Sequence, residues 1–182
     1  MDVARQNREA QRLARFVQRG AFDADDEQCA ALAALRDERG LGTRLLFVPR
    51  VDHDRVADYL RASDLGMLLY PRSRALGEFA SPLKLLEYLA SGLPVVATRL
   101  DGIEEIVVDG VNGRLVSPGD AVAAAAAVDG LLGDERLLAR FAAGAEATAE
   151  QYTYDRRAER IETALREVLV RRPEEAALCI ST

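Results

Sequence analysis

Residues 81–98 read SPLKLLEYLASGLPVVAT, and this segment predicts a helix entrance, a buried helix and a parallel strand in succession. Ser81 is a favourable N-cap, and Pro82 suits the first helical position because the N–H that it lacks would be unpaired there. The apolar residues that follow lie on almost every face of the helix, which indicates packing on more than one side. Residues 95–98 complete the segment as the strand.

Two charged residues stand out in this predicted helix. Lys84 lies in the first turn, where the helix dipole disfavours a cation by about 0.3–1 kcal/mol, and a bound anion would reverse that penalty. The free backbone N–H groups of the same turn also suit a phosphate. Glu87 follows about one turn deeper, where its carboxylate could accept hydrogen bonds from ribose hydroxyls. An i,i+3 ion pair between Lys84 and Glu87 on a solvated face is the alternative, and the residues alone leave both interpretations open.

The rest of the chain alternates predicted strands with predicted helices, which favours a parallel sheet flanked by helices. The other expected strands lie at 44–48, within 64–70 and at 113–116. The other expected helices lie at 3–19, 26–39, 53–62, 119–132, 134–149 and 154–171. A turn is expected at Gly102 and a ligand-facing loop at 71–80. Ligands of such sheets bind beyond the carboxyl ends of the strands, so the loops after Val48, Tyr70 and Thr98 are expected to line the site.

The segment 81–98 and two segments after it resemble the carboxyl-terminal domain of a family 4 retaining glycosyltransferase. The two segments are 101–107, DGIEEIV, and 109–120, DGVNGRLVSPGD. The resemblance covers about residues 30–172. It implies the two-domain GT-B fold and transfer of a sugar from a nucleotide-sugar donor with retention of the anomeric configuration. It also implies that no catalytic metal and no cofactor are needed, and that the donor substrate is a UDP- or GDP-sugar.

The same resemblance implies roles for both of the family's paired glutamates. Glu87 matches the second glutamate, which binds the donor ribose. Glu78 corresponds to the first, which acts at the donor sugar and is the candidate catalytic residue, although it lies one residue further from Glu87 than the family pattern places it. Arg50 falls where the family has a turn that contacts the nucleotide base, so it is also expected at the ligand.

The donor diphosphate is expected at the start of the helix. The resemblance implies that the backbone N–H groups of Leu83 and Lys84 hold it, within the turn that Pro82 begins. Ser81 is the expected side-chain contributor. Arg72, in the preceding loop, supplies a further positive charge for phosphate.

The resemblance also sets the expected fold class and domain organisation. The fold is expected to be α/β, a Rossmann-like parallel sheet flanked by helices, forming one GT-B carboxyl-terminal domain without its first strand. Residues 29–172 are expected to form this domain, after a helical segment at 1–28 and before a disordered tail at 173–182. The family's opening strand, its Gly-rich turn and its amino-terminal domain find no match. The chain alone is therefore expected to be inactive, because donor and acceptor must be held together in a closed cleft.

Composition is typical of a soluble globular domain. The chain has 182 residues, 49% of them hydrophobic, and a formal net charge of −6, which gives no general attraction to nucleic acid. Cys29 and Cys179 suggest neither a disulfide framework nor a zinc site, and the sole histidine, His53, is expected at a helix start rather than at a metal. No apolar run is long enough for a transmembrane helix, so the cytoplasm is the expected location.

Three functions remain open on the sequence. The first is the donor-binding part of a glycosyltransferase, completed by a separate amino-terminal domain or accompanied by self-association through an uncovered apolar face. The second is a noncatalytic nucleotide-binding or interaction module of the same fold. The third, an unrelated flavodoxin-like domain, lacks the phosphate loop that should follow a first strand.

Overall fold

The structure is a computed structural model that describes residues 16–19, 27–42, 44–48, 52–71 and 83–171. The chain divides into two compact units, Met1–Val56 and Ala57–Thr182, and each is described by itself. The helix α3, His53–Arg61, begins in the first unit and ends in the second, and Val56 is its buried residue. The expected helix at 53–62 is thereby confirmed.

The first unit contains a two-stranded parallel sheet and one helix. Strand β1, Phe16–Arg19, pairs with β2, Leu45–Val48, and the helix α2, Glu27–Glu38, lies between them in sequence. Gly40 has a φ of 64°, a left-handed conformation that glycine adopts without strain and that commonly ends a helix. The strand expected at 44–48 and the helix expected at 26–39 are both confirmed.

The helix expected over 3–19 is wrong at Phe16–Arg19, which form β1. Four residues span barely one helical turn, so their apolar spacing cannot separate a helix from a strand. The pairing with Leu45–Val48 decides the conformation, because the parallel partner supplies backbone hydrogen bonds that the local sequence does not reveal. Residues 1–15 lie outside the described residues.

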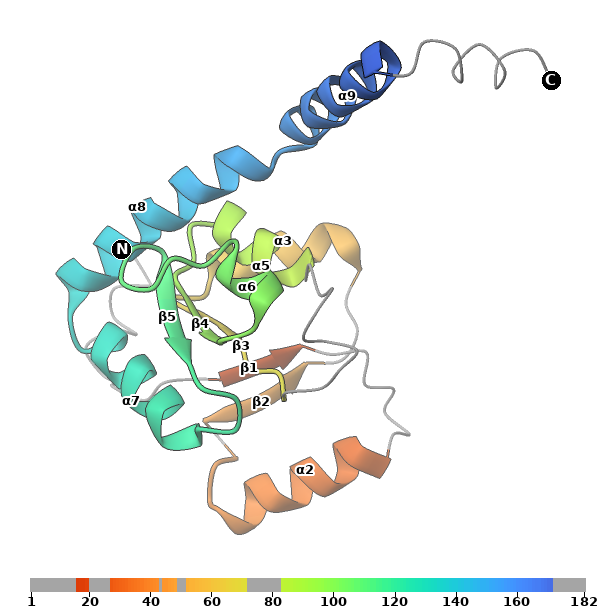
Figure 1. Cartoon of the computed structure of the whole chain (residues 1–182). Helices are drawn as coiled ribbons and strands as arrows, with labels where there is room; N and C mark the ends of the chain where they lie inside the picture. Colours follow the sequence, from red (N-terminus) through yellow and green to blue (C-terminus); the bar gives the residue numbers. More distant parts are fainter. Residues whose placement is uncertain (1–15, 20–26, 43, 49–51, 72–82, 172–182) are drawn as a thin grey trace, which may run out of the picture. The chain divides into compact units, whose positions relative to one another are not determined.

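The second unit is built on a three-stranded parallel sheet (Figure 1). Its strands are β3, Gly66–Leu68, β4, Val95–Thr98, and β5, Gly113–Val116, in the spatial order β3-β4-β5. The crossover from β3 to β4 contains α5, Leu83–Ala90, and the crossover from β4 to β5 contains α6, Asp101–Glu104. All three strands were expected near these positions, and β5 has the bounds that the sequence predicts.

Strand β4 lies at the centre of this sheet, and all four of its residues are buried. Val95 and Ala97 pack into one apolar cluster with Leu85 and Leu89 of α5. Val96 belongs to a second cluster, which contains the buried side chains of α7. Figure 1 shows α5 and α7 on opposite sides of β4. Coverage on both faces explains why β4 is continuously apolar rather than alternating.

Four further helical segments follow β5. They are α7, Ala121–Leu132, α8, Glu135–Ala149, the 3-10 turn η1, Glu150–Tyr152, and α9, Tyr154–Arg171. Asp120 caps α7 by accepting a hydrogen bond from the Ala123 N–H at 2.9 Å, and Asp134 caps α8 in the same way. These carboxylates satisfy N–H groups that have no partner inside the helix. The three helices expected over this region are confirmed.

The turn before β5 is fixed by one buried amide. The Asn112 Nδ2 donates to the Ile106 carbonyl and to the Thr148 Oγ1, both at 2.9 Å, while its Oδ1 accepts from the Val108 N–H at 2.8 Å. Asn112 thereby joins the turn to α8, where Thr148 lies. At Gly144 in α8, a Cβ would come within 2.3 Å of the Val111 carbonyl oxygen, so only glycine permits this approach.

The last helix, α9, differs from the others because every described side chain from Thr153 to Leu169 is exposed. Its large apolar side chains recur at three- and four-residue spacing, which places most of them along one stripe of the helix. They are Tyr154, Ile161, Leu165, Val168 and Leu169, each at least half exposed. We call these five residues the α9 stripe.

Candidate functional site

The candidate site lies at the edge of the sheet where β3 and β4 end. The helix α5 follows β3 and returns the chain to the start of β4, so its first turn lies at the carboxyl edge of the two strands. Lys84, in that turn, is exposed, and Glu87, about one turn deeper, is half-buried. The structure therefore places two of the predicted site residues side by side along one helix at the expected edge.

The helix itself packs as the sequence predicts, against the sheet and against α8. Leu85 and Leu89 are fully buried. Leu83 is the exception, since 69% of its side chain is exposed. The expected role of the Leu83 backbone N–H at the diphosphate stays a prediction.

The structural alternative for Lys84 and Glu87 was an ion pair between them. Within the part of the chain that the structure describes, neither the Lys84 amine nor the Glu87 carboxylate forms a recorded ion pair or side-chain hydrogen bond. The Glu87 backbone is held separately, because its carbonyl accepts a hydrogen bond from the Ser91 hydroxyl at 2.9 Å. Both charged groups are thus presented on a fixed helix without using each other as partners.

Two neighbouring residues, Tyr70 and Thr98, join the ends of the two strands. The Tyr70 N–H donates a 2.8 Å hydrogen bond to the Thr98 hydroxyl, across 28 positions of sequence. Thr98 is the last residue of β4 and is only 2% exposed. Sequence reasoning named both residues only as the points where loops begin, and the single available signal was a hydroxyl that ends an otherwise aliphatic strand.

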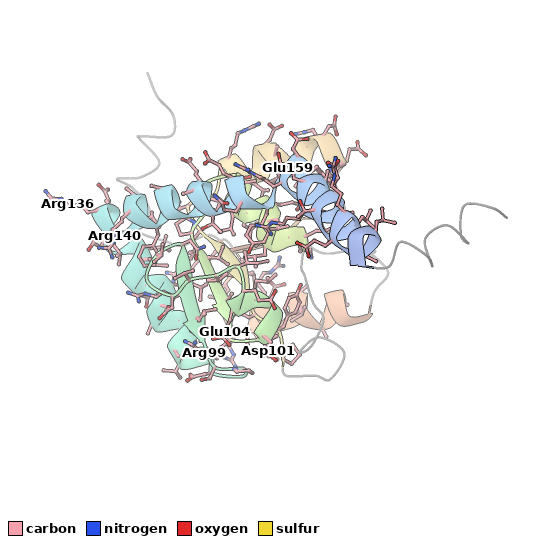
Figure 2. The ribbon with its side chains drawn as sticks, turned by 45° about the horizontal axis from the view of Figure 1, so that its top comes forward. Arg99, Asp101, Glu104, Arg136, Arg140 and Glu159 are labelled. Carbon is pink, nitrogen blue, oxygen red and sulfur yellow. The ribbon has the colours of Figure 1, made fainter. Side chains whose placement is uncertain are left out.

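A cation that the sequence reasoning missed lies just beyond β4. The Arg99 Nη1 forms an ion pair of 2.6 Å with the Glu104 Oε1, and Figure 2 shows the two side chains with Asp101 at the same end of the molecule. The Arg99 N–H also bonds to the Val116 carbonyl, which continues the β4–β5 pairing. Its charge is balanced by Glu104, so Arg99 offers less attraction to phosphate than Lys84 does.

A turn was expected at Gly102, but the structure has a short helix there, because Gly102 lies inside α6. The Glu105 N–H bonds to the Asp101 carbonyl, so one helical turn closes around the glycine. Glycine is a weak helix former, but a single turn stabilised by the buried side chain of Ile103 tolerates it.

The remaining predicted site residues lie outside the described residues. They are Arg50, Arg72, Glu78, Ser81 and Pro82. Their roles stay predictions, and so does the disordered tail expected at 173–182.

The described residues contain no group of three or more His, Cys, Asp or Glu side chains placed to hold a metal ion, and metal independence stays a prediction. None of the helices there is long and apolar enough to cross a membrane. The cytoplasmic location also stays a prediction.

Comparison with known proteins shows which family this chain resembles. The sequence model of the family "Glycosyl transferases group 1" matches residues 2–134. This range includes residues 2–28, whose match to the family was unclear from the sequence alone. A D-inositol 3-phosphate glycosyltransferase of Xylanimonas cellulosilytica is 33% identical over 159 residues, which are 87% of this chain and 37% of that protein. The chain thus spans little more than a third of this curated relative.

Solved structures show the same fold. The carboxyl-terminal domain of a group 1 glycosyl transferase from Francisella tularensis is 24% identical with a TM-score of 0.63, covering 73% of this chain and 66% of that one. Anabaena HepE was solved with UDP and with UDP-glucose. These structures are 26% and 28% identical, with TM-scores of 0.59 and 0.54. They cover 76% and 70% of this chain, and 36% and 34% of theirs.

The expected α/β fold, a Rossmann-like parallel sheet flanked by helices, is therefore confirmed, and its structural relatives are GT-B glycosyltransferases. The family match covers well over half of the chain and agrees with the resemblance that the sequence motifs carry. This chain belongs to the group 1 glycosyl transferase family.

Proposed function

We propose that this chain is the nucleotide-sugar-binding part of a retaining glycosyltransferase and binds a UDP- or GDP-sugar at the first turn of α5 without a metal ion. One observation carries the proposal: Lys84 and Glu87 lie on a packed helix at the carboxyl edge of a parallel sheet, and the described residues give neither charge a partner. Ligands of open α/β sheets bind at this edge. The UDP and UDP-glucose complexes of HepE support the choice of ligand.

The geometry suits a nucleoside diphosphate. The N–H groups of the first turn point out of the helix without intrahelical partners, and they favour an anion together with the Lys84 amine. The helical rise of 1.5 Å per residue places Glu87 about 4.5 Å further along the axis than Lys84. A single nucleotide can therefore contact Lys84 through its phosphates and Glu87 through its ribose hydroxyls.

The same groups have a chemical role in sugar transfer. As the bond between sugar and phosphate breaks, negative charge grows on the departing diphosphate. Fixed N–H donors and a lysine amine at that position stabilise the developing charge. Glu78 is proposed to act on the donor sugar, as the family resemblance implies. In this account the helix terminus and Lys84 take the place that a metal ion has in other transferases.

Transfer itself needs a bound acceptor, and we propose that a separate amino-terminal domain supplies it. The chain spans 37% of the D-inositol 3-phosphate glycosyltransferase, so most of such an enzyme lies outside it. The α9 stripe supports the need for a partner, because its large apolar side chains are exposed. Exposed apolar surfaces of this kind often mark sites of protein–protein interaction. If no amino-terminal domain restores sugar transfer, the alternative function holds. The chain is then a noncatalytic module that binds a nucleotide at the same site.

Calorimetric titration with UDP, GDP and ADP tests the binding site. We expect the wild-type chain to bind UDP or GDP, and Lys84→Ala to weaken binding about tenfold because it removes one charge-assisted contact. Glu87→Gln is expected to weaken binding by a similar factor. Arg136→Ala is the matched control, because it removes an exposed positive charge from α8, and Arg136 lies away from Arg99, the residue that follows β4 (Figure 2).

Two results would overturn the proposal. A folded wild-type chain that binds none of the three nucleotides has no donor site. If Lys84→Ala and Arg136→Ala change the affinity equally, net charge and not a local contact governs binding.

A further inference from the structure

The pairing of β3 with β4 ends in an unusual way at the candidate site. Within the ladder, the Gly66 N–H bonds to the Pro94 carbonyl at 2.9 Å, and Leu68 lies opposite Ala97. In a regular parallel ladder the next rung would join the Tyr70 N–H to a backbone carbonyl of β4. The Tyr70 N–H instead donates to the side-chain hydroxyl of Thr98, at 2.8 Å.

A side-chain acceptor replaces the backbone acceptor at the rung after the end of β3. The Thr98 hydroxyl extends out of the backbone of β4, so the chain at Tyr70 can diverge from β4 and still have its N–H satisfied. The neighbouring Leu69 is 44% exposed, whereas Leu68, one residue earlier, is 5% exposed. The last buried residue of β3 is therefore Leu68, two positions before Tyr70.

Tyr70 is also connected to the first turn of α5 through packing. Its half-buried side chain packs against the apolar cluster that contains Leu85 and Leu89. Leu85 is fully buried and follows Lys84 directly. The Thr98 hydroxyl thus binds the Tyr70 backbone from the strand side, and the Tyr70 side chain packs against the same apolar cluster as the residue that follows Lys84.

We propose that Thr98 is a positioning residue for the diphosphate site. It acts through Tyr70, and it contacts neither phosphate nor sugar in this account. The inference rests on the proposed function, because it concerns the same nucleotide site. It assigns a ligand-related role to a buried threonine that would otherwise be counted only as the end of a core strand.

Three threonine substitutions distinguish positioning from general stability. Thr98→Val keeps the shape and the β-branch of the side chain but removes the acceptor for the Tyr70 N–H. Thr98→Ser keeps the hydroxyl and serves as the rescue variant. Thr148→Val is the matched control, because it removes the hydroxyl that accepts from Asn112 in the same unit.

The measurements are UDP affinity by calorimetry, well below the unfolding temperature of each variant, and the exchange rate of the Tyr70 amide proton. We expect Thr98→Val to weaken UDP binding about fivefold, the effect of losing one ordinary hydrogen bond. Thr98→Ser should bind within about twofold of wild type. Thr148→Val should lower stability and leave the affinity unchanged. In the wild type, UDP should slow exchange of the Tyr70 amide.

The outcomes separate this inference from the proposed function. If the wild type binds UDP but Thr98→Val binds it equally well, Thr98 has no positioning role and the nucleotide site still stands. If Thr98→Val and Thr148→Val weaken binding alike, the effect is general destabilisation and the inference is wrong. If Thr98→Val does not fold, the wild type provides the test. The inference is then wrong if UDP leaves the exchange rate of the Tyr70 amide proton unchanged. A wild-type chain that binds no nucleotide overturns both.

Discussion

Replacement of Asn112 by alanine should be among the most damaging single changes that a polar residue of this domain can undergo. The side chain is fully buried and makes three hydrogen bonds, to the Ile106 carbonyl, the Thr148 hydroxyl and the Val108 N–H. An ordinary hydrogen bond contributes about 0.5–1.5 kcal/mol net, and a buried group left without a partner costs about 1–3 kcal/mol. Asn112→Ala loses all three bonds and strands the Val108 N–H and the Ile106 carbonyl. We therefore expect a loss of about 3–4 kcal/mol in the free energy of unfolding.

Urea unfolding followed by circular dichroism measures this loss. Since small domains have a total stability of about 5–15 kcal/mol, the midpoint should fall markedly while the slope stays the same. Val122→Ala, on α7, is the control, because Val122 is 81% exposed and its truncation should change stability by less than about 0.5 kcal/mol. If Asn112→Ala is no more destabilising than Val122→Ala, the buried amide does not hold the turn to α8.

Two further predictions concern local structure. Gly144→Ala should destabilise the chain by about 1–3 kcal/mol in the same urea assay, because the added Cβ would overlap the Val111 carbonyl oxygen and force α8 to shift. An unchanged unfolding midpoint would show that α8 does not pack this closely against Val111. The pKa of the Asp37 carboxyl is lowered, chiefly by the 2.7 Å hydrogen bond from Arg36. The linked stability is present above the unfolded pKa of Asp37 and is lost as the pH falls through the folded one. Carboxyl titration by NMR should show Arg36→Gln raising this pKa, and no rise would contradict the pair.

Much of the fold could be predicted from the sequence because long elements carry their own signals. The helices α7 and α8 follow Asp120 and Asp134, whose carboxylates accept hydrogen bonds from the first turn of each helix. Strand β5 begins at Gly113, where a Cβ would meet the Val95 carbonyl oxygen. For α7 and α8, the residue that precedes the helix in sequence caps its first turn, so local sequence indicates where the helix starts.

Two short elements were not predicted, because contacts with residues distant in sequence determine their conformation. Phe16–Arg19 is a strand on account of its pairing with Leu45–Val48, and α6 is a helical turn on account of the buried Ile103. Neither interaction is visible in a window of four residues.

In the candidate site, too, local sequence identified some residues and not others. Lys84 was identified from the sequence because a cation in a first helical turn conflicts with the helix dipole, a conflict visible in local sequence. Thr98 was not, because its role depends on the register between two strands that are far apart in the chain. Arg99 was missed although it opens the loop after Thr98, which the sequence predicts to line the site.

The central claim is that a nucleotide binds at the first turn of α5, and the chain offers a direct chemical probe of that turn. Lys84 is the only lysine in the sequence. An amine-acetylating reagent therefore modifies one side chain, and the α-amino group of the expressed chain provides an internal reference. The rate of acetylation of Lys84 is followed by mass spectrometry of the peptide that contains it, with and without UDP or GDP.

We expect UDP or GDP to slow acetylation of Lys84 in proportion to occupancy and to leave the α-amino group unaffected. Adenosine, which carries no phosphate, should protect neither amine. If a nucleotide that binds by calorimetry leaves the acetylation rate of Lys84 unchanged, the ligand lies elsewhere and the first turn of α5 is not the diphosphate site.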